Sequence, residues 1–277
     1  MTTTYYEKCI VHEKVPTKNL IRLSQLQRQA NKSRTVETTE EYYKKLSELC
    51  NKLRYNRVTV SQHPTFTFDN VKSTNWTLEL IRVAHTASEL ILKQAEEEEE
   101  DFKKKNKLYE RALKYANDCC RYSASVLFER NTNKLSKYLN PRYHLSRVFS
   151  IAADKLYNMN ECKPTYLAVE RAFQLIEIAS MLWDDEDMKI KSVKYESKAL
   201  LALANKIDEN DCGERVALLE SVTAKEGCLP EVVAQYESFK QQNEQVYYKP
   251  VHTDRKIKLL NVSEAFDISS KCFVIDQ

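Results

Sequence analysis

The residues of this chain that could do chemistry are its histidines, its cysteines and a few adjacent carboxylates. The histidines show no His-Glu-x-x-His or His-x-His spacing, and they are His12, His63, His85, His144 and His252. The pairs Asp184–Asp185 and Asp208–Glu209 could act as general acid and base. Both pairs fall where a helix is expected to begin or end, and helix capping explains acids there. His85 falls inside a predicted helix, where we interpret it as a packed side chain.

The cysteines form no Cys-x-x-Cys pair, and they are Cys9, Cys50, Cys119, Cys120, Cys162, Cys212, Cys228 and Cys272. Adjacent cysteines such as Cys119 and Cys120 are poorly placed for a zinc site or an ordinary disulfide. The N-terminal sequence MTTTYYEKC has no apolar signal region. We therefore expect free thiols in a reducing compartment, a cytoplasmic protein, and no metal or other cofactor.

An enzyme of a common class finds little support in the composition. Only two glycines occur, Gly213 and Gly227, although glycine makes up roughly 7% of an average protein. Phosphate-binding loops, dinucleotide fingerprints and nucleophile elbows each need several glycines. A serine or cysteine nucleophile also needs a base and an orienting group, and the sequence shows no such set. The sequence predicts a protein that is not an enzyme and has no small-molecule substrate.

The charges are balanced and interspersed: 43 basic and 40 acidic residues give a net charge of +3. This pattern is typical of solvated helix faces, and it predicts no binding of nucleic acid. We interpret the acidic run Glu96–Asp101, which precedes several lysines, as an exposed helix segment with i,i+4 ion pairs. The apolar stretches are shorter than the roughly 20 residues that span a bilayer, which predicts a soluble protein.

Helical periodicity dominates the chain from Thr39 to about Gln245. Residues 75–95 are apolar around most of the circumference, which predicts a helix buried on several sides. Further helices are expected over 107–130, over 143–159, over 164–183, after the acidic residues 184–187, after Gly213 and from Pro230. Residues 5–15 and 59–68 are expected to be extended or β, and residues 246–260 to be extended chain over the helices.

Short links between these helices favour antiparallel neighbours. We therefore predict an all-α fold: an elongated, irregular helical solenoid of antiparallel helices with a tetratricopeptide-like core and short extended or β segments near the N-terminus. One domain is expected over residues 1–277. Its core covers about residues 5–260, and the tail 261–277 has no predicted structure.

Several local patterns occur in the order found in a known family. They are residues 9–18 (CIVHEKVPTK), 42–54 (YYKKLSELCNKLR), 66–69 (FTFD), 113–128 (LKYANDCCRYSASVLF), 213–219 (GERVALL) and 243–251 (NEQVYYKPV). Together they resemble the BRO domain, the helical domain of ALIX-like endosomal adaptors. Phe68 stands where the family has a tryptophan, and Ser125 stands where it has a glycine.

The resemblance implies a non-enzymatic adaptor of the ESCRT and multivesicular endosome pathway, cytoplasmic and recruited to endosomes. In the family, an apolar groove receives the amphipathic C-terminal helix of an ESCRT-III subunit. Carried over to this chain, the partner-binding residues are Tyr122, Leu127, Phe128, Val148 and Ile151. The aromatic residue of the family motif corresponds to Leu127 or Phe128.

Three alternatives stay open, one of which is an enzyme that uses a buried acid or cysteine. All five of these side chains could belong to the core instead of a groove. The chain could also be a general tetratricopeptide-like peptide-binding scaffold unrelated to ESCRT. Peripheral membrane contact would depend on the partner or on basic residues between Lys103 and Lys107.

Overall fold

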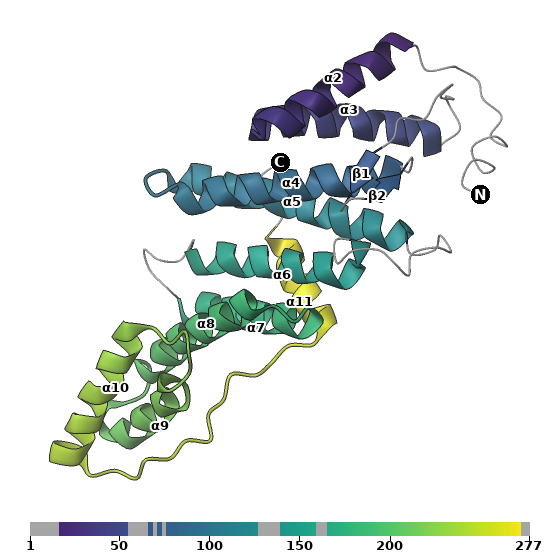
Figure 1. Ribbon diagram of the computed structural model, residues 1–277. Coiled ribbons are helices and arrows are strands. Elements are labelled where there is room, and N and C mark those ends of the chain that lie inside the picture. The colour runs from purple at the N-terminus through teal and green to yellow at the C-terminus, as the bar shows by residue number, and fades with distance from the viewer. Residues whose placement is uncertain are drawn as a thin grey trace. The chain divides into compact units, whose positions relative to one another are not determined.

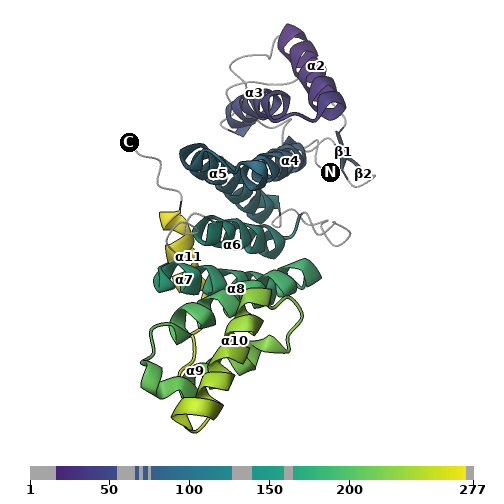
Figure 2. The ribbon, with the colours of Figure 1, turned by 90° about the vertical axis from the view of Figure 1, so that its left-hand side faces the viewer.

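A computed structural model of the chain describes residues 17–54, 66–68, 71–73, 76–126, 139–158 and 165–272. Over these residues the protein is all-α, as predicted, apart from one short hairpin (Figures 1 and 2). The α-helices are α2 (Thr17–Ser33), α3 (Val36–Arg54), α4 (Trp76–Glu97), α5 (Phe102–Val126), α6 (Pro141–Asn158), α7 (Tyr166–Leu182), α8 (Glu186–Ala204), α9 (Cys212–Thr223), α10 (Pro230–Gln242) and α11 (Val262–Lys271). None of the described helices is long and apolar enough to cross a membrane.

The chain divides into two compact units. The first contains residues Met1–Glu99 and Arg111–His144, and the second contains Glu100–Glu110 and Leu145–Gln277. Helices α5 and α6 therefore contribute residues to both units. The single domain predicted over 1–277 stays a prediction.

In the first unit, α2 packs on α3, and α3 packs on α4. Arg34, in the link between α2 and α3, has a positive φ of 50°, which allows the chain to reverse there. Helix α4 is buried on several sides, as predicted; its closed side chains include Ile81, Ala84 and Ala87. The strands β1 (Phe66–Phe68) and β2 (Val71–Ser73) form an antiparallel pair in which Phe66 lies opposite Ser73.

In the second unit, α7 packs on α8, α8 packs on α9, and α9 packs on α10. Their apolar faces meet in a core that includes Leu200, Val216, Leu219, Val232 and Phe239. Asp185 caps α8, because its carboxylate accepts a hydrogen bond from the Met188 N–H at 3.3 Å. Pro230 is the first residue of α10, where the missing N–H leaves no helix bond unmade.

Two of the described helices were not predicted, and one interpretation was wrong. Helix α2 precedes the periodic region, and α11 lies in the tail that had no predicted structure. The acidic run does not form one helix: α4 ends at Glu97 and α5 begins at Phe102, so residues 98–101 link the two. Like charges at i,i+4 oppose a continuous helix there, and Asp101 instead accepts a hydrogen bond from the Lys104 N–H at 2.9 Å.

The segments predicted to be extended have different outcomes. Residues 248–261 contain no helix or strand, as expected. This segment begins two residues later than predicted, because residues up to Tyr247 form the π-helical turn η3 (Asn243–Tyr247). We call residues 248–261 the strap; Figure 1 shows it in yellow-green between α10 and α11. Strand β1 covers the end of the segment expected over 59–68, and residues 5–15 and 59–65 lie outside the described part of the chain.

Candidate functional site

The five residues predicted to bind a partner lie in different settings. Tyr122 belongs to α5 in the first unit, and Val148 and Ile151 belong to α6 in the second. Val148 is 1% exposed and Ile151 is fully closed to solvent, so neither presents a surface to a partner in this structure. Leu127 and Phe128 lie outside the described residues. The groove predicted from the resemblance therefore stays a prediction.

Tyr122 is half-buried and takes part in the internal packing of the first unit. Its side chain packs against the apolar cluster of Leu78, Ile81 and Leu139. Its hydroxyl lies 3.5 Å from that of Tyr43, which donates to Asp118 at 2.7 Å. Tyr122 thus has a structural role within the first unit.

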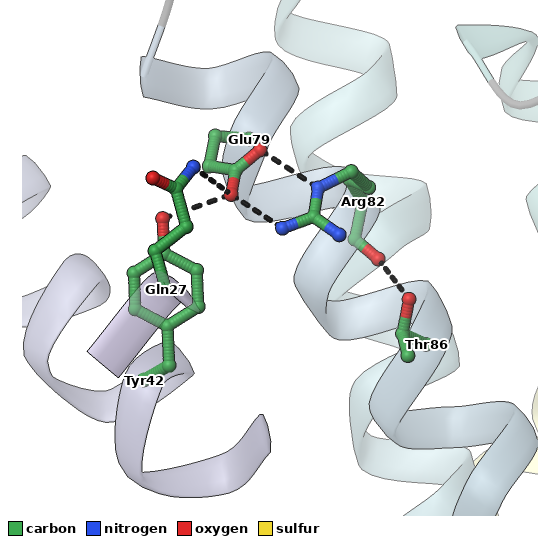
Figure 3. Close-up of polar contacts among 5 residues, drawn as sticks. All are labelled: Gln27, Tyr42, Glu79, Arg82 and Thr86. Atoms are coloured by element: carbon green, nitrogen blue, oxygen red, sulfur yellow. Dashed lines mark hydrogen bonds and ion pairs between the residues drawn. The ribbon is translucent and has the colours of Figure 1, made fainter. Parts of the chain in front are cut away.

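The carboxylate of Glu79 in α4 is fully enclosed in the first unit, because its side chain is 0% exposed. Arg82, one turn along the same helix, forms a bidentate pair with it: Nη2 lies 2.6 Å from Oε1, and Nε lies 2.8 Å from Oε2. Tyr42 from α3 donates its hydroxyl to Oε1 at 2.8 Å, and Gln27 from α2 donates an amide N–H to the same oxygen at 3.2 Å. Figure 3 shows the four side chains converging, and we call them the Glu79 cluster.

The Glu79 cluster holds three helices together. A carboxylate without partners would be very costly to bury, but both of its oxygens here accept charge-assisted or hydroxyl hydrogen bonds. Burial, together with the neighbouring carboxylate, raises the pKa of the Tyr42 hydroxyl well above its usual value. Tyr42 therefore stays protonated and remains a donor. Because the other three side chains all donate to the Glu79 carboxylate, we assign the cluster a structural role.

A second set of polar contacts links α3 to α5. Glu40 accepts hydrogen bonds from Tyr115 at 3.1 Å and from Arg111 at 2.7 Å. The rings of Tyr43 and Tyr115 meet edge to face with centroids 5.0 Å apart. Tyrosines on α3 and α5 thus use both their rings and their hydroxyls to join these helices.

The second unit has a comparable buried acid, Asp154 on α6. Tyr195 of α8 donates to its Oδ1 at 2.5 Å, and Lys191 pairs with its Oδ2 at 3.0 Å. The rings of Tyr157 and Tyr195 stack with centroids 4.1 Å apart. Burial and the nearby carboxylate raise the pKa of Tyr195, so this hydroxyl also stays a donor. Asp154 therefore fastens α8 to α6.

Two of the carboxylates considered above for catalysis cap the start of a helix or turn. Asp185 caps α8, and Asp208 accepts a hydrogen bond from the Asn210 N–H at 2.8 Å at the start of a short 3-10 turn, η2 (Glu209–Asp211). Burial raises the pKa of the thiols of Cys119, Cys120, Cys212, Cys228 and Cys272, which favours the unreactive thiol. The described cysteines form no disulfide, and the described residues include no group of three or more His, Cys, Asp or Glu side chains placed to hold a metal ion.

The strap is held by polar side chains that form hydrogen bonds with its backbone. Asn243 donates its amide N–H to the Lys249 carbonyl at 2.8 Å and accepts from the Lys249 N–H at 2.9 Å. Gln174 of α7 donates to the Lys258 carbonyl at 2.6 Å. Asn243 is 6% exposed and Gln174 is 7% exposed, so both amides are buried. Backbone groups of the strap satisfy them.

Every second side chain of the strap from Thr253 to Ile257 also contacts the helices α8 to α10. Glu214 of α9 accepts hydrogen bonds from Thr253 at 3.0 Å and from the Arg255 guanidinium at 2.8 Å. Ile257 packs against the core formed by α8, α9 and α10. A Cβ on Gly213 would collide with the carbonyl oxygen of Pro250, so the absence of a side chain there lets the strap approach α9.

Few sequence features indicate either the Glu79 cluster or the contacts of the strap. The only local signal for the Glu79 cluster is the i,i+3 pair of Glu79 and Arg82 in an otherwise apolar helix. Asn243 and Gly213 open two of the segments that carry the family resemblance. Both residues contact the strap, and this contact depends on how the chain folds; no spacing in the sequence indicates it.

The outer face of α11 carries large apolar side chains. Ala265 and Ser269 are buried, and α11 packs on α7. Val262 and Phe266, four residues apart, are 44% and 49% exposed, and Leu259 just before the helix is also exposed. Lys155 anchors the other end of the helix by donating to the Cys272 carbonyl at 2.8 Å. Helix α11 thus presents two exposed apolar side chains, while its other face packs on α7 and its C-terminal end is bonded to Lys155.

Comparison of the chain with protein-family models, with curated protein sequences and with solved structures found no match.

Proposed function

We propose that this protein is a non-enzymatic adaptor that binds an amphipathic helix of another protein. The observation that carries the proposal is the pair of exposed apolar side chains on α11, Val262 and Phe266. Residues at i and i+4 share one face of a helix, and a partner helix packs its own apolar stripe on such a face. The capping box between Asn261 and Glu264 fixes the start of α11, so this face is already formed before binding.

The resemblance to the BRO domain suggests the partner. We propose the C-terminal amphipathic helix of an ESCRT-III subunit, bound by a cytoplasmic protein that this interaction recruits to endosomes. The resemblance places the contact at Tyr122, Leu127, Phe128, Val148 and Ile151. The exposed pair on α11 is a second candidate surface for the same helix.

Binding of a fluorescently labelled ESCRT-III C-terminal helix to the full chain tests this function. We expect micromolar affinity for the wild-type protein. Val262→Asp with Phe266→Asp should weaken binding at least about tenfold if α11 is the surface, because a charge in an apolar contact is left without a partner. Leu127→Asp with Phe128→Asp tests the surface that the resemblance implies.

Matched controls separate loss of the site from loss of the fold. Lys271→Asp makes the same total change of charge at an exposed position on the opposite side of α11, nine residues after Val262, and should leave affinity unchanged. Circular dichroism should give the same helix content for all variants. If the wild-type chain does not bind the helix, the proposed function is wrong; if neither pair of aspartates weakens binding, both surfaces are wrong.

A further inference from the structure

The strap is held in the way that proteins hold extended peptides. Two buried amides, those of Asn243 and Gln174, bond to backbone groups that any residue carries. Specific contacts come from alternate side chains, Thr253, Arg255 and Ile257, which extended chain directs to the same side. Backbone bonds supply affinity and alternate side chains supply specificity in known modes of peptide recognition.

The surface under the strap keeps its hydrogen-bonding groups available to another extended chain. The small exposed fractions of Asn243 and Gln174 include the cover that the strap provides, so water would reach both amides if the strap lifted off. Exchanging such a hydrogen bond for one to water costs only about 0.5–1.5 kcal/mol. The open surface would therefore favour a ligand that returns a backbone carbonyl and N–H to these positions.

The strap itself buries little apolar area. Most of its residues are exposed, including Val251 and Leu259, and Ile257 is its contact with the apolar core. Segments with few buried apolar contacts open at low free energy. The strap is thus attached mainly by polar contacts that a second chain could reproduce.

We propose that the surface formed by Gln174, Gly213, Glu214 and Asn243 is a binding site for an extended basic peptide of another protein, and that the strap occupies it in the free protein. The ligand would carry a hydroxyl, a cation and an aliphatic side chain at alternate positions, as in Thr-x-Arg-x-Ile. The strap fits a basic ligand class, since its 14 residues include four Lys or Arg and one Asp. This inference goes beyond the helix binding proposed above, because it concerns another surface and an extended ligand.

Competition explains how such a site would be regulated. A segment tethered at both ends acts at an effective concentration on the order of millimolar. A free peptide at micromolar concentration would therefore not displace it. A partner that also binds elsewhere on the chain would gain a similar advantage and could exchange with the strap.

The test uses a labelled synthetic peptide with the strap sequence, residues 248–261, and measures its binding by fluorescence anisotropy. The protein is the full chain with Arg255→Ala and Ile257→Ser, which weaken the strap and leave the surface intact. We expect this variant to bind the wild-type peptide at least tenfold more tightly than the wild-type protein does. Adding Glu214→Gln to the variant should reduce binding about tenfold, because the peptide arginine then loses its carboxylate.

Two further variants keep the outcome clear. Asp254→Ala alters a strap side chain that is 96% exposed, and the protein should then behave as wild type. Arg255→Ala alone, which leaves Ile257 in the core, should bind the peptide to an intermediate degree even if the double variant proves unstable.

Three results would overturn the proposal. The first is no binding to either weakened protein, and the second is equal binding to weakened and wild-type proteins, which would place the peptide elsewhere. The third is a dimer of the wild-type chain that the free peptide converts to monomer, because the natural occupant would then be the strap of a second copy. Each leaves the test with the ESCRT-III helix unaffected.

Discussion

The Glu79 cluster and the strap are two ways of using buried polar side chains. In the cluster, side chains from α2, α3 and α4 bond to one another around a single carboxylate. At the strap, the side chains of Asn243 and Gln174, which lie outside it, form hydrogen bonds to its backbone carbonyls. The cluster recognises particular residues of its own chain, whereas the backbone clamps would accept any extended segment of suitable shape.

This difference has consequences for stability and for exchange. Removing one member of the cluster leaves a charge or a donor without a partner inside the first unit, so the fold itself should suffer. Loosening the strap should affect the strap and little else. The four predictions below test this contrast from the largest expected effect to the smallest.

We expect Glu79→Gln to cost about 3 kcal/mol of the free energy of unfolding, near the lower end for breaking a buried ion pair. The amide keeps one acceptor oxygen for several donors, and its NH2 group must face a guanidinium N–H of Arg82. Urea unfolding of the full chain, followed by circular dichroism, measures the loss. Glu97→Gln on the same helix is the matched control, because its ion pair with Lys93 at 3.7 Å is exposed and should contribute less than about 0.5 kcal/mol.

Equal losses for the two substitutions would contradict the role given to the cluster. A loss confined to Glu79→Gln would support it. Combining Glu79→Leu with Arg82→Met and Tyr42→Phe sharpens the point: replacing the ion pair and the buried hydroxyl together by apolar groups should recover much of the stability, because no buried charge or hydroxyl is then left without a partner.

Tyr42→Phe should cost about 2 kcal/mol at pH 7, because the Glu79 carboxylate loses a hydroxyl donor. Burial raises the folded-state pKa of Tyr42 above the ordinary value of about 10. Its contribution is therefore fully present below pH 10 and is lost as the pH rises further, because the unfolded chain releases the proton first. The stability difference between wild type and Tyr42→Phe should shrink above pH 10 by up to about 1.4 kcal/mol per pH unit.

Urea midpoints measured between pH 7 and 11 check this prediction. The same pair of proteins at pH 7 to 9 provides the reference, where the difference should be constant. A difference that stays constant up to pH 11 would mean that the Tyr42 hydroxyl is not held as a buried donor.

The sequence predicted the fold class and most helices because their apolar periodicity is strong. Helix α4 was expected over residues 75–95 and is found over Trp76–Glu97, and α10 begins at Pro230 as expected. Helix α11 escaped prediction because its buried positions, Ala265 and Ser269, are small and carry little periodic signal. Helix α2 also escaped prediction; among its described side chains the buried apolar ones are Leu23, Leu26 and Ala30.

The polar sites could not be predicted because their members are distant in sequence. Gln27 and Glu79 are 52 residues apart, and Gln174 and Lys258 are 84 apart. Spacing relates residues on one helix, but these contacts depend on how helices pack. The predicted groove shows the same limit: Val148 and Ile151 carry an apolar pattern that suits a groove or a core equally, and the structure closes both from solvent.

Gly213→Ala tests the strap from the side of α9. Alanine favours a helix over glycine by up to about 1 kcal/mol, so propensity alone would make this substitution stabilising. The added Cβ, however, collides with the Pro250 carbonyl. We expect the strap to detach, and trypsin to cut after Lys256 or Lys258 about tenfold faster, which corresponds to about 1.4 kcal/mol.

Glu220→Ala, on an exposed position of α9, is the control for this substitution. It should leave the cleavage rate unchanged. If Gly213→Ala stabilises the chain and slows cleavage, the strap does not depend on close contact with α9.

Asn261→Ala should have the smallest effect, about 1 kcal/mol, because it removes the N-cap of α11. Asn261 accepts from the Glu264 N–H at 2.9 Å, and Glu264 returns a bond to the Asn261 N–H at 2.8 Å. Amide exchange should quicken in the first turn of α11, while α4 stays as protected as in wild type. Ser263→Ala, in the same turn but exposed, is the matched control.

The strap ends where this cap begins, so trypsin cleavage of Asn261→Ala adds a second reading. If α11 holds the strap in register, cleavage after Lys258 should rise together with exchange in α11. If cleavage stays slow, Asn243, Glu214 and Gln174 hold the strap without help from α11. That outcome would strengthen the contrast with the Glu79 cluster, because the clamps would then hold an extended chain whatever follows it, as a site for a separate peptide must.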